Sequence, residues 1–229
     1  MKHVHDSAAA RKRILSTCVR LFIEQGYKET TPKQILTEAQ VSPSSFYNLF
    51  PSKSAVLSVL CDFMFENQFA IAGGVVGKDA SGPLLYGVET AIQITLAEMN
   101  EKLREIYDLV YTEPALLDLI QRRTAAELPR LFGTYLPEST ESDFYELEIG
   151  TSAIMRGYMV KACDETFPLE RKLERFIRMS LAAFSVPEDE INRVIEAVLA
   201  LDIRGIADKV MQKLFAELEV RFDFTLTDQ

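Results

Sequence analysis

The side chains best suited to recognition chemistry are Ser44, Ser45 and Asn48, which lie within one short run of the sequence. Hydroxyl and carboxamide groups can donate and accept hydrogen bonds, and an Asn carboxamide can pair bidentately with adenine. Phe46 and Phe50 stand four residues apart, so in a helix their rings share one face and point inward. The pattern predicts a short helix whose outward face fits a base-pair edge or a phosphate.

Two helix starts of the same kind position this run. Thr31 precedes Pro32 and Ser42 precedes Pro43. In each pair the hydroxyl can cap a helix, while proline takes the first position, where no N–H is needed. Gln34 stands three residues after Thr31, which is the spacing of a capping box. The sequence therefore predicts two short helices joined by a tight turn. This is the arrangement of a helix-turn-helix, whose second helix enters the major groove of DNA.

A larger set of residues carries a family resemblance. The positions that agree in type and spacing, without a gap, are Arg13-Ile14-Leu15, Leu21-Phe22, Gly26-Tyr27, Thr30-Thr31, Ile35, Ala39, Val41-Ser42, Phe46-Tyr47, Phe50-Pro51-Ser52-Lys53 and Leu57. Together they resemble the N-terminal domain of TetR-family transcriptional repressors, over about residues 10–60. The family usually has glycine in the turn where this chain has Gln40. Glutamine there must adopt a positive φ at some cost or use a different turn.

We expect this region to contact double-stranded DNA. Ser44, Ser45 and Asn48 are predicted to contact base edges. The side chains predicted to contact phosphates are Thr31, Lys33, Ser42, Tyr47 and Lys53. Lys53 is also predicted to lie beside a helix N-terminus, where the dipole favours phosphate. A homodimer would place two recognition helices in successive major grooves of a palindromic operator.

The distribution of charge agrees with contact to DNA at one end only. The net charge is −9 at pH 7, yet residues 1–60 carry eight Lys and Arg against four Asp and Glu. The remaining residues hold 17 basic and 30 acidic side chains. A basic N-terminal region on an acidic body is typical of a protein that touches nucleic acid with one part of its surface.

Composition predicts a cytoplasmic protein. The chain is 48% hydrophobic and 26% charged, which is ordinary for a globular protein, and no apolar run is long enough to predict a membrane span. The first residues lack the apolar core of a secretory signal. Cys18, Cys61 and Cys163 show no motif spacing, which indicates reduced thiols.

We find no pattern for catalysis, a cofactor or a metal. The sequence has no glycine-rich phosphate loop, no Gly-x-Ser-x-Gly and no Cys-x-x-Cys. His3 and His5 are the only histidines. We expect them in a disordered arm over residues 1–8, which offers no further ligand. The protein is therefore predicted not to be an enzyme.

The fold class is predicted to be all-α, because no segment from residue 60 onward alternates as a strand would. We predict an N-terminal three-helix helix-turn-helix DNA-binding domain, residues 1–52, and a larger helical effector-binding and dimerisation domain, residues 53–229. The approximate helices predicted are 7–25, 32–39, 43–50, 53–72, 84–100, 103–111, 114–135, 143–164, 169–184 and 187–222. A glycine-containing stretch, residues 73–83, is expected to interrupt the helices.

The helical body is rich in aromatic and methionine side chains, which either fill a core or line an apolar pocket. The resemblance implies that a small effector binds in this region, and its identity is not legible in the sequence. The residues predicted to line the pocket are Tyr107, Tyr111, Phe132, Met155, Tyr158 and Met159. The resemblance also implies a four-helix dimer interface. Our first choice for it is residues 143–164 with 169–184, and our second is residues 187–222.

The sequence thus predicts a dimeric, ligand-responsive transcriptional repressor, and two alternatives remain open. A redox-sensing regulator would use Cys61 or Cys163. A helical scaffold for a protein partner would have lost DNA binding, and the missing turn glycine is the feature that favours it.

Overall fold

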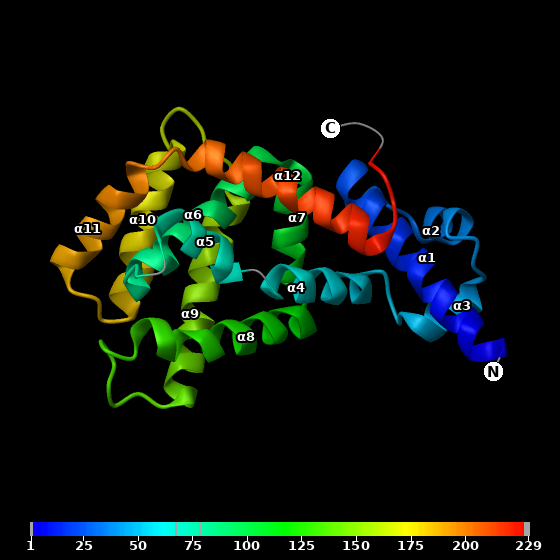
Figure 1. Cartoon of the computed structure of the whole chain (residues 1–229), viewed down its shortest axis with the longest axis horizontal. Helices are drawn as coiled ribbons and strands as arrows, with labels where there is room; N and C mark the ends of the chain where they lie inside the picture. Colours follow the sequence, from blue (N-terminus) through cyan, green and yellow to red (C-terminus); the bar gives the residue numbers. More distant parts are fainter. Residues whose placement is uncertain (1, 67, 78, 227–229) are drawn as a thin grey trace. The chain divides into compact units, whose positions relative to one another are not determined.

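The structure is a computed structural model that describes residues 2–66, 68–77 and 79–226. Its elements within those ranges are all helices, as predicted (Figure 1). They are α1 (Lys2–Glu24), α2 (Pro32–Glu38), α3 (Pro43–Leu49), a 3-10 turn η1 (Ser54–Val56), α4 (Leu57–Glu66), α5 (Gln68–Val76), α6 (Gly82–Met99), α7 (Glu101–Val110), α8 (Pro114–Phe132), α9 (Glu141–Val160), α10 (Leu169–Ala183), α11 (Glu188–Leu199) and α12 (Ile203–Phe222).

The helices form two compact units, which we call the head and the body. The head comprises residues 1–63 and 211–229, and the body comprises residues 64–210. The division falls inside α4 and inside α12. The boundary predicted between residues 52 and 53 separates a DNA-binding domain from an effector-binding and dimerisation domain, and it stays a prediction.

The head is built on α1, against which α2 and α3 pack. Ile14, Cys18 and Phe22 follow one another at a spacing of four and are fully buried, so they form the apolar face of the helix. Ile35 of α2 and Phe46 of α3 are buried against the same core. The predicted disordered arm over residues 1–8 is wrong, because α1 begins at Lys2.

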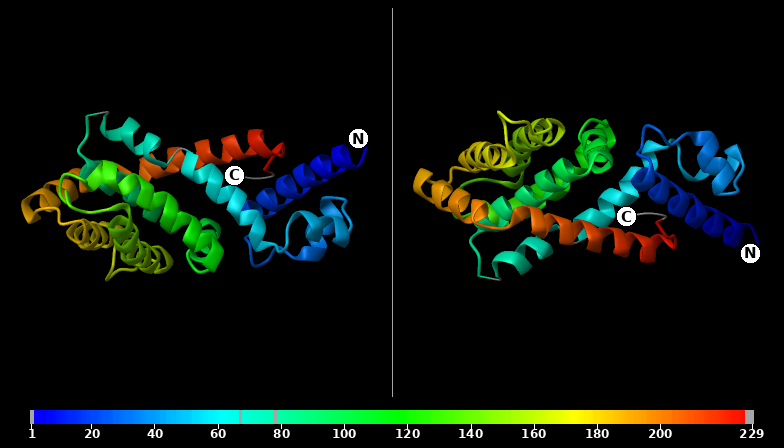
Figure 2. Two further views of the ribbon diagram at one scale, coloured as in Figure 1. Left: turned by 90° about the horizontal axis from the view of Figure 1, so that it is seen from below. Right: turned by 90° about the horizontal axis from the view of Figure 1, so that it is seen from above.

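The end of α12 also belongs to the head. The Lys12 ammonium lies 2.9 Å from the Asp223 carboxylate, and the Ser16 hydroxyl donates to the Asp223 carbonyl at 3.2 Å. Phe215 and Phe222 are buried, so apolar contact joins these polar ones. Figure 2 shows the end of α12 beside α1, although the two segments stand at opposite ends of the sequence.

The body is organised around α6. This helix packs against α5, α7, α8, α9, α10 and α11, and twelve of its residues are buried. Such an all-round buried helix forms the centre of a bundle rather than one side of it. Phe132, Phe176 and Phe184, from the surrounding helices, are fully buried in the same core.

Several predicted helix ends in the body are wrong. Residues 73–76 of the expected interruption at 73–83 belong to α5, which ends at Val76 and is followed by Gly77 with φ of 90°. The long helical region predicted over residues 187–222, with Gly205 as its weak point, is divided before Ile203, and Asp202 caps the second part by accepting from the Gly205 N–H at 3.1 Å. Helix α11 begins at Glu188 without a side-chain cap, and Ser185, which has φ of 57°, lies before it.

A buried cation ties three elements of the body together. The Lys172 side chain is fully buried, and its ammonium lies 2.8 Å from a Glu98 oxygen and donates to the Lys161 carbonyl. Glu98 also accepts from the Cys163 N–H at 3.0 Å. Burial alone would raise the pKa of Glu98, but these hydrogen bonds and the charge of Lys172 lower it overall.

Lys172→Ala should lower the free energy of unfolding by about 3 kcal/mol, because it leaves the Lys161 carbonyl without this donor and Glu98 with only the Arg104 guanidinium, 3.7 Å away, as a cation. Because the folded-state pKa of Glu98 is lowered, the difference from wild type should be present at neutral pH and shrink as the pH falls through the carboxyl range. Urea unfolding at pH 7 and pH 4 measures both effects. Arg122→Ala, which removes an exposed pair with Asp118, is the control and should change the midpoint little. Equal losses in the two variants would contradict a special role for Lys172.

Candidate nucleic-acid interface

Helix α2 begins as predicted, with one difference. The Thr31 hydroxyl accepts from the Gln34 N–H at 3.2 Å, and Pro32 occupies the first turn. The Gln34 side chain does not complete a capping box. It accepts from the Gln25 carboxamide at 2.8 Å and donates to Glu38 at 3.0 Å instead. Gln34 therefore connects α2 to the end of α1.

Helix α3 also begins with a hydroxyl cap followed by proline. The Ser42 hydroxyl accepts from the Ser45 N–H at 3.1 Å, and the two hydroxyl oxygens lie 2.9 Å apart. Phe46 and Phe50 are buried with ring centroids 6.2 Å apart. A seven-residue helix is too short to be stable by itself, so these two rings fix its orientation.

The turn between α2 and α3 is a Schellman motif with glutamine in the glycine position. Gln40 has φ of 51°, its N–H donates to the Thr37 carbonyl at 3.3 Å, and the Val41 N–H donates to the Leu36 carbonyl at 3.1 Å. The Arg13 guanidinium donates to the Ala39 carbonyl at 3.0 Å and holds the turn on α1. Of the two outcomes expected for Gln40, the structure shows the positive φ.

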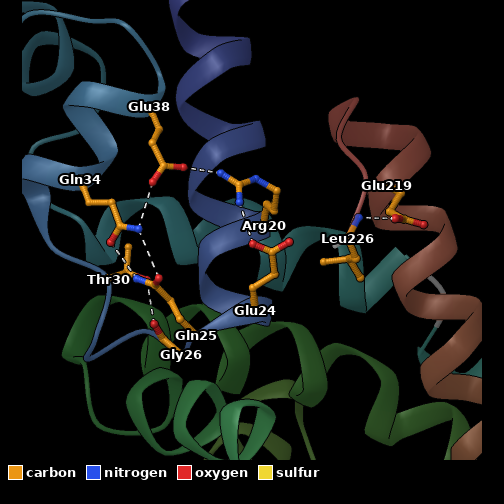
Figure 3. Close-up of polar contacts among 9 residues, drawn as sticks. All are labelled: Arg20, Glu24, Gln25, Gly26, Thr30, Gln34, Glu38, Glu219 and Leu226. Atoms are coloured by element: carbon orange, nitrogen blue, oxygen red, sulfur yellow. Dashed lines mark hydrogen bonds and ion pairs between the residues drawn. The ribbon is translucent and has the colours of Figure 1, made fainter. Parts of the chain in front are cut away.

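Polar side chains lock α2 onto α1, as Figure 3 shows. Arg20 binds Glu24 of its own helix at 2.6 Å and binds Glu38 of α2 with its other terminal nitrogen. Gln25 donates to both Gln34 and the Thr30 hydroxyl. These contacts set the angle at which α2 leaves α1, and no local pattern in the sequence predicts them.

The outward face of α2 and α3 is open. Tyr47 is 53% exposed, and Lys33, Ser44 and Asn48 are exposed too. Within the described part of the chain the side chains of Lys33, Ser44 and Asn48 have no hydrogen-bond or ion-pair partner. Thr31 and Ser42 are exposed helix caps, and Ser45 is half-buried against Ser42. Hydrogen-bonding groups that are solvated and unpaired can bind an external partner without first breaking an internal bond.

Lys53 has a different position from the other candidates. Its ammonium donates to the Tyr27 carbonyl at 2.6 Å and to the Thr30 carbonyl at 2.8 Å, and lies 3.8 Å from the centroid of the Tyr27 ring. The residue is half-buried, and the start of η1 is capped by Ser52 instead, whose hydroxyl accepts from the Ala55 N–H at 3.2 Å. Lys53 therefore fixes the loop that leads into α2.

The cysteines show no reactive thiol. Cys18 and Cys61 are buried and Cys163 is half-buried, and none of the three forms a disulfide. Burial raises the pKa of the Cys18 thiol to about 12, and burial also raises that of Cys163. Because the thiolate is the nucleophile, such thiols react slowly. This chemistry gives no support to a redox-sensing role for Cys163.

The six aromatic and methionine residues predicted to line a pocket all lie on the body helices α7, α8 and α9 or directly after them. Tyr107, Phe132, Met155 and Met159 are buried, while Tyr111 and Tyr158 are half-buried. Their ring contacts fall into two groups with no shared member. Phe132 packs against Tyr86, Tyr135 and Phe184, whereas Tyr158 packs against Phe167 and Phe176.

Sequence reasoning missed two buried carboxylic acids, Glu89 of α6 and Glu148 of α9, each 4% exposed. Burial raises the pKa of each to about 8, so both are largely protonated at neutral pH when nothing is bound. The available signal was position: Glu148 shares a helical face with Met155 and Met159, at spacings of seven and eleven.

The described residues include neither a cluster of metal ligands nor a helix that could span a membrane. They contain no group of three or more His, Cys, Asp or Glu side chains placed to hold a metal ion. Their helices also include none with the length and hydropathy needed to cross a bilayer.

Comparison with known proteins identifies relatives of this chain. The family model described as "Bacterial regulatory proteins, tetR family" matches residues 14–60. The chain is 30% identical over 114 residues to the Bacillus subtilis (strain 168) protein named "Uncharacterized HTH-type transcriptional regulator YvkB", covering 49% of this chain and 57% of that one. It is 34% identical over 58 residues to another from the same strain, YuxN, covering 25% and 20%. The chain thus spans 57% of the length of YvkB and 20% of the length of YuxN.

Gln40→Gly should raise the free energy of unfolding by about 1 kcal/mol, because glycine adopts the observed φ without the strain of a side chain. Chemical denaturation of the full chain measures this difference. Ala126→Gly, at an exposed position inside α8, is the opposite control and should lower stability by up to about 1 kcal/mol. A loss of stability in Gln40→Gly would mean that the glutamine side chain contributes something the turn geometry does not reveal.

Proposed function

We propose that this chain, whose residues 14–60 match the model of the tetR family of bacterial regulatory proteins, is a homodimeric repressor of transcription. It would bind a palindromic double-stranded DNA operator through the head. A small molecule bound in the body would change the affinity for that operator. We assign it no catalytic role.

One observation carries the DNA-binding proposal: α3 presents Ser44 and Asn48 unpaired on its outer face while Phe46 and Phe50 anchor its inner face. A rigid helix with free donors and acceptors is what readout in the major groove requires. The excess of basic residues in the first 60 positions adds the attraction to phosphate that supplies most non-specific affinity.

The proposed contacts divide between bases and phosphates. Ser44, Ser45 and Asn48 would read base edges. The residues proposed at phosphates are Thr31, Lys33, Ser42, Tyr47 and Lys53. Lys33 is the sharpest test of this group, because its side chain is exposed and has no hydrogen-bond or ion-pair partner among the described residues. Lys53 would contribute mainly through its charge and by fixing the loop before Thr31.

The exposed faces of α9 and α10 are the proposed dimer interface, which agrees with the first of the two choices made from sequence. Ile149 of α9 is 47% exposed and Met179 of α10 is 49% exposed. Gly150, Ala153 and Gly157 share the face of Ile149, and both glycines border open space. Small side chains between exposed apolar ones allow two helices to approach closely, as a four-helix interface needs.

Regulation would be a shift between two populations. An effector that binds one conformer of the body more tightly than another needs a coupling of only about 1–3 kcal/mol to change operator affinity by several-fold to a hundredfold. The protein-binding scaffold remains as an alternative of a different class. It predicts no DNA preference and no dependence of binding on salt.

The first experiment selects DNA from a random duplex pool at two salt concentrations. We expect a palindrome to be enriched and its affinity to fall steeply with salt. Asn48→Ala should relax the preference at about one base position and cost about 1–3 kcal/mol there. Lys33→Ala should weaken binding to all sequences and reduce the salt slope by about one unit. If no sequence is enriched, the scaffold replaces the repressor.

A second experiment tests the dimer. Ala153→Asp places a charge in the middle of the proposed interface, so analytical ultracentrifugation at micromolar concentration should show a monomer. Ala126→Asp puts the same charge on the exposed side of α8 and should leave the dimer intact. A dimer that survives Ala153→Asp and is lost in a variant of residues 188–222 would favour the second choice of interface.

A further inference from the structure

The end of α12 is held in the head mainly by apolar contacts. Phe215, Leu218 and Phe222 are buried at spacings of three and four residues, so they form one inward face of the helix. The guanidinium of Arg221 lies 5.1 Å from the centroid of the Phe63 ring, which is a cation–π contact within the head. Residues 211–226 therefore keep their place in the head without depending on an ion pair.

Asp223 directly follows α12 and has a backbone conformation that glycine adopts more readily. The helix ends at Phe222, and Asp223 has φ of 58°. The Phe224 N–H donates to the Glu219 carbonyl at 3.2 Å, and the Glu219 carboxylate accepts from the Leu226 N–H at 2.6 Å (Figure 3). Asp tolerates a positive φ better than most residues do, but glycine adopts it without strain. The turn by itself would favour glycine, so the carboxylate of Asp223 needs another explanation.

The Asp223 carboxylate meets a lysine of α1. It lies 2.9 Å from the Lys12 ammonium, while the Ser16 hydroxyl donates to the Asp223 carbonyl at 3.2 Å. The side chains of Lys12 and Asp223 are 63% and 76% exposed, so water and salt screen their attraction. Such exposed ion pairs contribute little to the stability of a fold. The larger effect of the pair is on the charge of the head, because Asp223 cancels the charge of Lys12.

Lys12 belongs to a basic run that borders the proposed recognition helix, α3. It stands in the middle of the only three consecutive Lys or Arg residues of the sequence. The Arg11 guanidinium lies 5.5 Å from the centroid of the Phe50 ring, directly after α3, and Arg13 donates to the Ala39 carbonyl in the turn before it. The two neighbours of Lys12 thus reach both ends of α3. A duplex read by α3 would therefore bring its phosphates close to this run.

Other basic side chains of the head have partners of a different kind. Arg20 binds two acids that join α1 to α2, and Lys53 binds two backbone carbonyls, so both fix the structure of the head. Lys33 has no hydrogen-bond or ion-pair partner among the described residues. Lys12 is solvated like Lys33, yet it is bound to an acid. A hydrated ammonium on a flexible stem can exchange one anion for another, so a phosphate can replace the Asp223 carboxylate.

We propose that Asp223 sets the strength of DNA binding as a counter-ion within the chain. It binds Lys12 in the free protein, and a DNA phosphate must displace it before Lys12 contributes to affinity. This inference rests on the proposed binding of DNA by the head. A lysine that is already neutralised releases few counterions when DNA binds. The chain thus lowers its own sequence-independent affinity, and the base contacts of α3 supply a larger share of the binding free energy.

Asp223→Asn tests this exchange. Asparagine has the same shape, tolerates a positive φ and keeps the backbone carbonyl that Ser16 binds, so the segment should stay docked. With Lys12 freed, the plot of log affinity against log salt should become steeper by about 0.9. If the two proteins bind alike at 1 M salt, this slope gives about eightfold tighter binding at 0.1 M. Fluorescence anisotropy with a labelled duplex of random sequence, over a series of salt concentrations, measures both effects.

A double-mutant cycle shows whether Asp223 acts through Lys12. In the Lys12→Ala background no ammonium is left to release, so Asp223→Asn should change the affinity by less than about twofold. A gain of the same size in both backgrounds would mean that the acid simply repels DNA, and it would overturn the proposal.

Glu196→Gln is the matched control for net charge. It removes the same charge from an exposed residue of α11, in the body. This variant should bind the duplex as wild type does. A gain in affinity equal to that of Asp223→Asn would mean that only the total charge of the chain matters, which contradicts a role for the Lys12–Asp223 pair.

The same titrations separate this inference from the proposed function. If wild type and Asp223→Asn bind the duplex with the same affinity and the same salt slope, DNA binding stands and the counter-ion role is refuted. If neither protein binds even at low salt, the proposed DNA binding is refuted and the counter-ion role falls with it. Binding by Asp223→Asn alone supports both.

Discussion

The recognition surface depends on a single constraint, which is that neither seven-residue helix of the head can hold its own conformation. Each is stabilised from outside, by a cap at its start and by contacts with α1 along its length. Arg13 holds the turn, Arg20 holds the end of α2, and Phe46 fixes α3. Because all three contacts end on α1, the angle of the outward face is set by one long helix. Rigid presentation limits the entropy that DNA binding would cost.

The body treats buried charge in two different ways. Glu98 has a buried lysine, a backbone donor and a lowered pKa, which together make a closed structural pair. Glu89 and Glu148 have one neutral donor each and raised pKa values. One bundle thus contains a buried acid that is paired with a lysine and two buried acids that accept from neutral donors only. Burying Glu89 and Glu148 costs free energy of folding. Acids kept in a core at such a cost are more informative about function than the ion-paired Glu98.

Much of the head could be predicted because its signals are local. The Thr31-Pro32 and Ser42-Pro43 pairs fix the starts of α2 and α3 to the residue, and the spacing of Phe46 and Phe50 fixes the buried face. The division near Asp202 had local signals too, because Gly205 marks a weak point in the helical pattern and Asp202 is a typical N-cap residue.

What could not be predicted depends on partners far away in the sequence. The ammonium of Lys53 meets the Tyr27 and Thr30 carbonyls only because the fold brings them together. Glu148 and Glu170 are both acids on helices, and one is buried while the other is exposed. No property of the residue type separates them. The helix face on which each carboxyl group lies, and the residues that pack against that face, decide whether the group is buried.

The packing of residues 211–226 on α1 has a consequence for biosynthesis. The head is assembled from the first and the nearly last parts of the chain, so its contacts span more than two hundred positions, as the Lys12–Asp223 pair illustrates. During translation the first residues emerge long before the segment that completes their unit. The nascent head therefore lacks this part of its unit until residues 211–226 have been synthesised.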